Sequence, residues 1–248
     1  MSYIAIDIEI HLQGIQMTHS MENSSNSLTP ADNSAFHQIS SRFSEPLDCL
    51  AAHLLYECSE VLAGIKPANL VSLVNRDRTC GRNLYQLWQT HRVELTQRIT
   101  NLKFRVLLSK NRSLLLFCYN PEQLQKHISH SGIRKILAIS GYDVCKDNDA
   151  LLDELCRRTE KSGGFPHEVG LFIGYPTKDV AAFMGIVKLP FACQGPWKIF
   201  GEPGQSLQLA NAFRISRQQM GRQLAGCNSP FECLETTLTT NSFFLQAE

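Results

Sequence analysis

The chain has no surplus of charge of either sign, and it has no long apolar run. Its 24 Lys and Arg residues balance 23 Asp and Glu residues, so the net charge is +1. Nucleic-acid binding proteins usually carry a basic surplus that neutralises phosphates and releases counterions. No apolar run approaches the roughly 20 residues that cross a bilayer. We therefore expect neither a nucleic-acid partner nor a membrane association.

Two further absences concern location and metal. The N-terminal stretch lacks a basic region, and Asp7 and Glu9 interrupt its apolar part, so it does not predict a secretory signal. Cysteine is abundant, with nine residues, but no C-x-x-C is present, which excludes a zinc ribbon and a thioredoxin-type motif. His127 and His130 lack a third ligand beside them. We expect a cytoplasmic protein with free thiols, no metal and no cofactor.

Composition divides the chain into three parts. Residues 22–34 are rich in Ser and Asn and cannot bury enough surface to fold. We therefore expect residues 1–44 to be a disordered extension, or one that precedes the true start of the protein. Residues 45–225 form one globular domain, which is long enough to bury a sizeable core. The tail, residues 226–248, lacks sustained periodicity and is expected to be loosely ordered.

The apolar periodicity of the domain predicts helices joined to a small sheet. The segments "FRVLLS" and "SLLLFCY" flank "KNR" and predict a hairpin, while residues 168–173 and "PWKIF" predict two more strands. The fold class is therefore α/β or α+β, a single domain with a mixed sheet of about four strands covered by helices. The predicted helices are 46–63, 82–101, 121–130, 133–139, 149–161, 177–184 and 205–224.

The first candidate site pairs Cys58 with His167. A nucleophilic thiol needs a base within hydrogen-bond reach and a lowered pKa, and Glu168 or Asn69 could orient that base. Such a site would perform hydrolysis or acyl transfer. However, Cys58 lies on the apolar stripe of its helix and near the C-terminus, where burial and the dipole both disfavour a thiolate. A histidine bonded to backbone carbonyls at a strand entry is the favoured explanation of His167.

The second candidate consists of two junctions, "IGYPTKD" at 173–179 and "FGEPGQS" at 200–206. Each ends an apolar strand with a glycine, Gly174 or Gly201, and leads into a helix whose N–H groups favour anions. If the strands are parallel neighbours, both junctions lie at one edge of the sheet. Neither matches a phosphate-binding fingerprint, so two ordinary connections are the alternative. The predicted cleft would be bordered by Tyr175, Thr177, Glu202 and Ser206.

The third candidate is the turn "AGIKPANL", residues 63–70, which places Lys66 and Asn69 between apolar segments. A lone lysine in a turn is usually solvated, and Asn69 could simply supply turn hydrogen bonds. In a binding protein, Lys66, Tyr175 and Lys198 would instead line a pocket for a small anionic ligand or for the acidic group of a protein partner.

Four segments of this chain together resemble the bacterial family known as domain of unknown function 3793. They are "CSEVLAGIKPANLVSL", "LLLFCYNPEQL", "FPHEVGLFIGYPTKDVAAFM" and "GPWKIFGEPGQSLQLANAF", and the similarity covers roughly residues 45–220. The resemblance implies no activity. Where the family pattern has a cysteine after the final "AF", this chain reads "RISRQQ", which weakens a shared metal or redox role for the motif cysteines. The residues that fall in the family's motifs are Cys58, Lys66, Asn69, His167, Glu168, Gly174, Tyr175, Pro176, Cys193, Trp197 and Lys198.

Three functions therefore stay open at the level of sequence. One is a thiol-dependent hydrolase or acyl transferase that uses Cys58 and His167. Another is a non-catalytic binding or accessory module with a small anionic ligand or a partner at the glycine junctions. The third is a thiol redox accessory protein. Whether the protein is an enzyme is not decided by the sequence.

Overall fold

The structure is a computed structural model, and it describes residues 42–234 apart from residues 79, 111 and 163–164. The predicted N-terminal extension therefore lies outside the described residues, except for residues 42–44. The last part of the predicted tail, residues 235–248, lies outside them as well. In the described part of the chain, no helix combines the length and the apolar character needed to cross a membrane.

The strands form two antiparallel sheets. The larger sheet has the order β1-β3-β2, and the smaller is the hairpin β4–β5. The α+β class is therefore confirmed, but the single mixed sheet of about four strands is not, because every strand pair in the described chain is antiparallel. The strands are β1 (Ala68–Val74), β2 (Lys103–Lys110), β3 (Ser113–Tyr119), β4 (Phe191–Gln194) and β5 (Lys198–Phe200).

The helices follow the predicted periodicity closely, with one interruption. The helix predicted over 46–63 divides at Cys58, whose backbone leaves helical geometry with φ −102° and ψ 16°. The helices are α3 (Pro46–Glu57), α4 (Ser59–Leu62), α5 (Leu84–Arg98), α6 (Pro121–Ile128), α7 (Ser131–Ile139), α8 (Asn148–Ser162), α9 (Val169–Phe172), α10 (Thr177–Phe183) and α11 (Gly204–Gly226).

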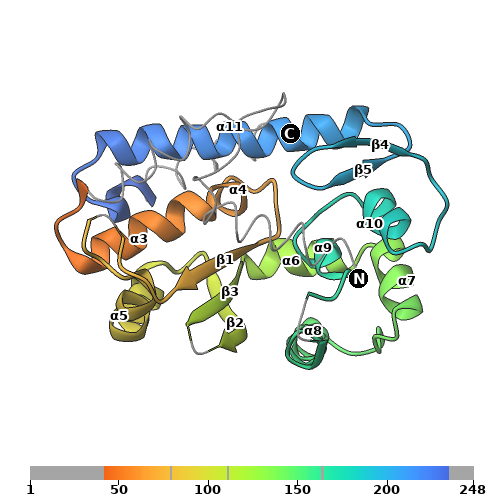
Figure 1. Cartoon of the computed structure of the whole chain (residues 1–248), viewed down its shortest axis with the longest axis horizontal. Coiled ribbons are helices and arrows are strands. Elements are labelled where there is room, and N and C mark those ends of the chain that lie inside the picture. The colour runs from red at the N-terminus through yellow and green to blue at the C-terminus, as the bar shows by residue number, and fades with distance from the viewer. Residues whose placement is uncertain (1–41, 79, 111, 163–164, 235–248) are drawn as a thin grey trace.

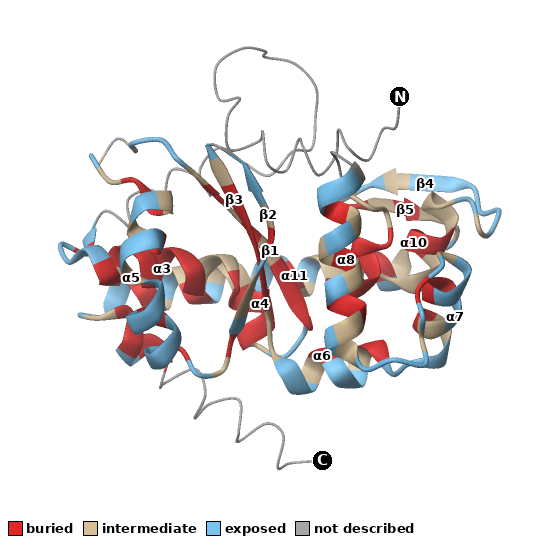
Figure 2. Ribbon diagram, turned by 90° about the horizontal axis from the view of Figure 1, so that it is seen from below, coloured by how far each residue is buried: buried red, intermediate tan, exposed pale blue. Residues whose placement is uncertain are grey.

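The larger sheet is covered on both faces, and β3 is its central strand. The side chains of Leu114 and Leu116 belong to the core that α3 and α5 cover, whereas Leu115 and Phe117 belong to the core beneath α6 to α10. Figure 2 shows the strands standing between these two groups of helices. Since successive residues of a strand point to opposite faces, the continuous apolar run of "SLLLFCY" supplies both cores.

The segment predicted as a strand at 168–173 is instead the single helical turn α9. Residues 169–173 are all buried. A short apolar run that is buried on every side has no periodicity that separates a strand from a helix. Two parallel strands would have placed the two glycine junctions at one edge of a sheet. Such a pair is absent from the described residues, so this arrangement of the junctions is wrong.

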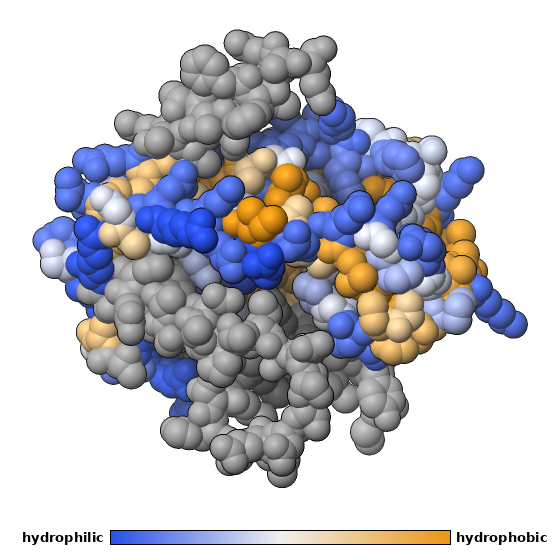
Figure 3. All heavy atoms as spheres, turned by 90° about the horizontal axis from the view of Figure 1, so that it is seen from above, coloured by the Kyte–Doolittle hydropathy of each residue, from blue (hydrophilic) through white to orange (hydrophobic). Residues whose placement is uncertain are grey.

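Helix α11 connects the two ends of the molecule. Figure 1 shows it running along most of the length, from above the β4–β5 hairpin to the start of α3. Near its middle Phe213 packs on Trp197 of the hairpin, and near its end Met220 and Leu224 enter the core of α3 and α5. The face that α11 crosses is largely hydrophilic, with scattered apolar side chains (Figure 3). Helix α11 therefore holds segments from both sides of the sheet together.

Residues 227–234, the described part of the predicted tail, pack against the core of α3 and α5. Phe231 and Leu234 are buried against the core of α3 and α5. Cys227 and Cys233 form a disulfide, which departs from the prediction that the cysteines are thiols. The other seven cysteines are free.

Candidate functional site

The turn after α9 packs directly on the turn that carries Lys66, and Gly174 makes this possible. Gly174 has a φ of +84°, and a Cβ at this position would lie 2.5 Å from Cδ of Pro67. Only glycine accepts both the left-handed backbone and this close approach. The contact brings Tyr175 over Lys66, although about a hundred residues of sequence separate them.

Lys66 is a nearly buried cation with few hydrogen-bond partners. The residue is 5% exposed, and its Nζ donates to Oδ1 of Asn69 at 2.8 Å. The same Nζ lies 5.5 Å from the ring centroid of Tyr175 and 5.1 Å from that of Phe213, within the range of cation–π attraction. An ammonium group has three N–H donors, and Asn69 is its only hydrogen-bond acceptor among the described residues.

Asn69 is held in place by the end of α3. Its Nδ2 donates to the backbone carbonyl of Glu57, and the residue is 7% exposed. The amide therefore connects α3 to the lysine, because its nitrogen donates to the carbonyl of Glu57 and its oxygen accepts from Lys66. This arrangement fixes the position of the single acceptor of Lys66.

Two carboxylates and an arginine lie beside the lysine. Nη2 of Arg217 is 2.9 Å from Oε1 of Glu60 and 3.8 Å from Oε2 of Glu57. Burial lowers the pKa of Lys66 to about 8, against the attraction of Glu60. Burial also raises the pKa of Glu57, and Arg217 offsets this only in part. Oppositely perturbed groups gathered in one place are typical of functional sites. We call Glu57, Glu60, Lys66, Asn69, Tyr175, Phe213 and Arg217 the Lys66 centre.

Aromatic rings form one wall of the Lys66 centre. Tyr175 stacks on Trp197 with centroids 4.7 Å apart, and Trp197 lies 6.0 Å from Phe213. Burial, together with the charge of Glu60, raises the pKa of Tyr175 to about 12. The phenol therefore stays neutral and can donate a hydrogen bond.

A second buried charge, Asp179, lies next to this wall and is fully satisfied. Its carboxylate accepts hydrogen bonds from Nε1 of Trp197 at 2.9 Å and from Oγ of Ser206 at 2.6 Å. It also accepts from the backbone N–H of Phe200 at 2.9 Å and from Nζ of Lys178 at 2.7 Å. Burial alone would raise the pKa of Asp179, but these bonds outweigh it and lower the pKa. We call these five residues the Asp179 centre.

The Asp179 centre joins the two glycine junctions through side-chain hydrogen bonds and not through parallel strands. Asp179 lies in the first turn of α10 and bonds to Ser206 in the first turn of α11. Oε1 of Glu202 accepts from the N–H of Gly204 at 2.8 Å. Each helix start therefore already has a carboxylate of the chain beside it, which satisfies the preference for negative charge there.

Four of the predicted residues lie around Phe183 or in the connecting turns. The rings of His167 and Phe183 meet edge to face, with centroids 5.3 Å apart. Nζ of Lys198 lies 5.5 Å from the centroid of the same Phe183 ring. Thr177 begins α10, and Gly201 forms the turn after β5 with a φ of 65°. These contacts differ from those of the Lys66 centre.

Glu168 belongs to a third group of contacts, between α8 and α9. Its Oε1 accepts from Nη1 of Arg158 at 3.0 Å and from the hydroxyl of Tyr142 at 3.2 Å. The guanidinium of Arg158 also lies 4.0 Å from the centroid of the Tyr142 ring. The described contacts of Glu168 thus tie two helices together.

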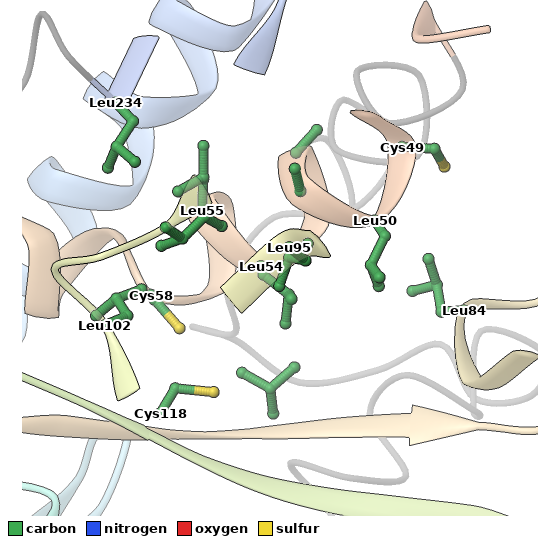
Figure 4. Close-up of a cluster of buried hydrophobic side chains, with 14 of the residues drawn as sticks. Cys49, Leu50, Leu54, Leu55, Cys58, Leu84, Leu95, Leu102, Cys118 and Leu234 are labelled. Carbon is green, nitrogen blue, oxygen red and sulfur yellow. The ribbon is translucent and has the colours of Figure 1, made fainter. Parts of the chain in front are cut away.

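Cys58 lies in the core beneath α3, where its sulfur points toward that of Cys118 on β3 (Figure 4). The hydrogen bond with Cys118 and then burial raise the pKa of the Cys58 thiol well above its ordinary value. The group therefore stays a neutral thiol at physiological pH, and the nucleophile is the thiolate. The surroundings of Cys58 do not favour nucleophilic catalysis.

A family model described as "Protein of unknown function (DUF3793)" matches residues 54–234 of the chain. The chain belongs to the DUF3793 family. This confirms the resemblance in the family motifs, and the matched region contains both the Lys66 centre and the Asp179 centre. No curated protein and no solved structure matches the chain.

Sequence reasoning missed four of the seven residues of the Lys66 centre in this DUF3793 chain, namely Glu57, Glu60, Phe213 and Arg217. Glu60 offered a signal, because it is a charged residue inside a strongly apolar helical segment. Phe213 and Arg217 offered none, since they belong to a helix that begins more than a hundred residues after Lys66. Only the packing of α11 on α4 brings them to the lysine.

Proposed function

We propose that this protein is a non-catalytic binding module that holds a small anionic ligand at the Lys66 centre. The observation that carries this proposal is the ammonium of Lys66, which is 5% exposed and has one hydrogen-bond acceptor among the described residues. Burying a charged donor with unfilled hydrogen-bond capacity is unfavourable. A ligand carboxylate or phosphate would fill that capacity and compensate the charge.

The turn that carries Lys66 is exposed just before the lysine, and a small ligand would enter there. Gly64 is exposed and Ile65 is 39% exposed, directly before Lys66 in the same turn. In the same centre, the side chain of Arg217 on α11 is 29% exposed. A ligand would therefore approach between this turn and α11.

The charges around the lysine limit the ligand to a small anionic group. Arg217 is already paired with Glu60, so Lys66 is the cation that a ligand would neutralise. The hydroxyl of Tyr175 adds a neutral donor beside it.

We also propose that the protein is cytoplasmic. Seven of its nine cysteines are thiols, as is usual in a reducing compartment.

Thermal unfolding in the presence of simple anions tests the proposal. Inorganic phosphate and acetate are titrated at constant ionic strength against chloride. A ligand at a hundredfold excess over its Kd stabilises the folded state by about 2.7 kcal/mol, which corresponds to a shift in Tm of roughly 5–10 °C for a protein of this size.

The control separates the site from general charge effects. Lys66→Met should abolish the shift, whereas Lys126→Met, at an exposed lysine of α6, should leave it unchanged. An equal shift in the wild type and in Lys66→Met, or no shift with either anion, would contradict the proposal.

A further inference from the structure

The amine of Lys66 has surroundings that suit covalent chemistry as well as ion pairing. Its Nζ lies 5.5 Å and 5.1 Å from the ring centroids of Tyr175 and Phe213, and the residue is 5% exposed. Aromatic walls exclude water, and a desolvated lysine gives up its proton more readily than an exposed one. The neutral amine is the nucleophile in reactions with carbonyl compounds.

The neighbours of Lys66 in the described chain occupy one of its three N–H donors. Asn69, from β1, accepts this N–H at 2.8 Å, and the exposed Gly64–Ile65 turn directly precedes the lysine in the chain. The charged and titratable groups that act on Lys66 are Glu60 and Glu57 from α4 and α3, Arg217 from α11, and the thiol of Cys58. Glu60 is occupied by Arg217 at 2.9 Å, so no carboxylate is bonded directly to the amine in the described chain.

We propose that Lys66 forms an imine with an aldehyde or ketone that carries an acid group, of which a 2-oxo acid is the simplest. This inference rests on the proposed function, because the acid group is the anion that the Lys66 centre would hold. It deepens that function by naming the class of ligand and the bond that retains it.

The reaction balances without an oxidant, a reductant or a metal. The lone pair of Nζ attacks the carbonyl carbon and forms a C–N bond, while the carbonyl oxygen takes up the electron pair of its π bond. Both hydrogens of the amine then leave with that oxygen as water, and a C=N double bond remains. A proton on the imine nitrogen restores the positive charge, so the acid group of the ligand keeps its electrostatic partner.

The pKa of Lys66, lowered to about 8 by burial, supports this chemistry. At pH 7 about one-tenth of the Lys66 amine groups are neutral, whereas less than about one-thousandth are neutral for an ordinary lysine. Attack on a carbonyl is correspondingly faster at Lys66 than at the exposed lysines. Trapping at Lys66 should therefore level off above about pH 8, where trapping at exposed lysines still increases.

Reductive trapping tests the inference. The full chain is incubated with pyruvate, a 2-oxo acid, and treated with sodium cyanoborohydride, which reduces an imine to a stable secondary amine. Peptide mass mapping should find Lys66 modified, with a mass gain equal to pyruvic acid less one oxygen atom. Lactate, which has the acid group but no carbonyl, and Lys66→Arg are the controls, and neither should give this modification.

The outcomes separate the imine from simple binding when thermal shifts are measured on the same samples. Selective trapping at Lys66, ahead of exposed lysines such as Lys126, supports the inference. Equal stabilisation by pyruvate and lactate without trapping at Lys66 overturns the imine but leaves anion binding intact. If neither compound stabilises the protein and none is trapped at Lys66, both proposals fail. Trapping at Lys66 no faster than at Lys126 also overturns the imine.

Discussion

The Asp179 centre and the Lys66 centre are two buried charges that share one aromatic wall, but their hydrogen bonding differs. Asp179 accepts from four donors that belong to Trp197, Ser206, Phe200 and Lys178. Lys66 has one acceptor among the described residues, Asn69. Trp197 connects the two, because it donates to Asp179 and stacks on Tyr175.

The difference indicates a division of labour. A buried carboxylate whose hydrogen-bonding capacity is filled by the chain contributes to stability and leaves nothing for a ligand to add. A buried ammonium with unfilled capacity does the reverse, because it reduces stability until a partner arrives. The comparison therefore predicts that substitutions at Asp179 change mainly folding, and that substitutions at Lys66 change mainly binding.

The largest expected effect comes from Asp179→Ala. The substitution removes the acceptor of Trp197, Ser206 and the backbone N–H of Phe200, and it should reduce the free energy of unfolding by about 4 kcal/mol. Urea unfolding at pH 7 measures it. The same change at Asp149, whose side chain is 84% exposed and 4.0 Å from Arg105, should cost less than about 1 kcal/mol.

The pH dependence of this variant provides a second check. Because hydrogen bonds lower the folded-state pKa of Asp179 below its ordinary value of 3.8, the carboxylate contributes stability above that value. This contribution is lost as the pH falls through the folded-state pKa. The difference between the wild type and Asp179→Ala should therefore shrink in acid. A difference that persists unchanged at low pH would show that the ionised carboxylate is not what matters.

The contact that positions Tyr175 over Lys66 is tested by Gly174→Ala. The new Cβ must keep a φ of +84° and would lie 2.5 Å from Pro67, so both backbone strain and overpacking reduce stability, by about 3–4 kcal/mol in total. Gly81→Ala is the matched control, since Gly81 has a φ of +73° and no atom of the described residues lies within 4 Å of its Cβ position.

Gly81→Ala should cost only the backbone term, about 1–2 kcal/mol. The excess loss in Gly174→Ala, measured by urea unfolding, then reports the clash with Pro67. Anions should also stabilise Gly174→Ala less than the wild type, because the substitution displaces Tyr175 from Lys66. Equal losses in the two variants would mean that the turn moves freely away from Pro67.

The last expected effect, at Lys66 itself, is a change of stability with pH, and it is seen in alkali. The folded-state pKa is about 8 and the ordinary value is 10.5, so the unfolded chain binds more protons between these two values. The wild type should therefore gain stability relative to Lys66→Met as the pH rises from 8 to 10.5, by about 3 kcal/mol. Chemical unfolding of both proteins across this range measures the gain, and a constant difference would contradict it.

Local sequence was sufficient for most of the secondary structure, because periodicity and capping act over a few residues. Asn120 caps α6 by accepting from the N–H of Gln123 at 3.0 Å, and Pro121 begins the helix as predicted. The hairpin of β2 and β3 was also predicted. Strands β1 and β4 were not, since β1 follows a proline turn and β4 is mostly exposed, so neither shows a clear strand pattern.

The candidate site was only half visible in the sequence. Lys66, Asn69, Gly174 and Tyr175 were selected from their turns, and the structure brings them together. His167 was selected in the same way, but it lies against Phe183 instead. A turn motif shows that the backbone is constrained, but it does not show which distant element the turn packs against.

The sequence by itself determined the charge balance of the chain, its family, most of its helices and the turns that carry Lys66 and Tyr175. Tertiary structure decided the partners of each charge. It placed α11 against α4, so that Arg217 pairs with Glu60, and it packed Gly174 on Pro67, so that Tyr175 covers Lys66. The physical reason is that periodicity and capping depend on neighbours in the chain, whereas desolvation and charge compensation depend on every group that packs around a site.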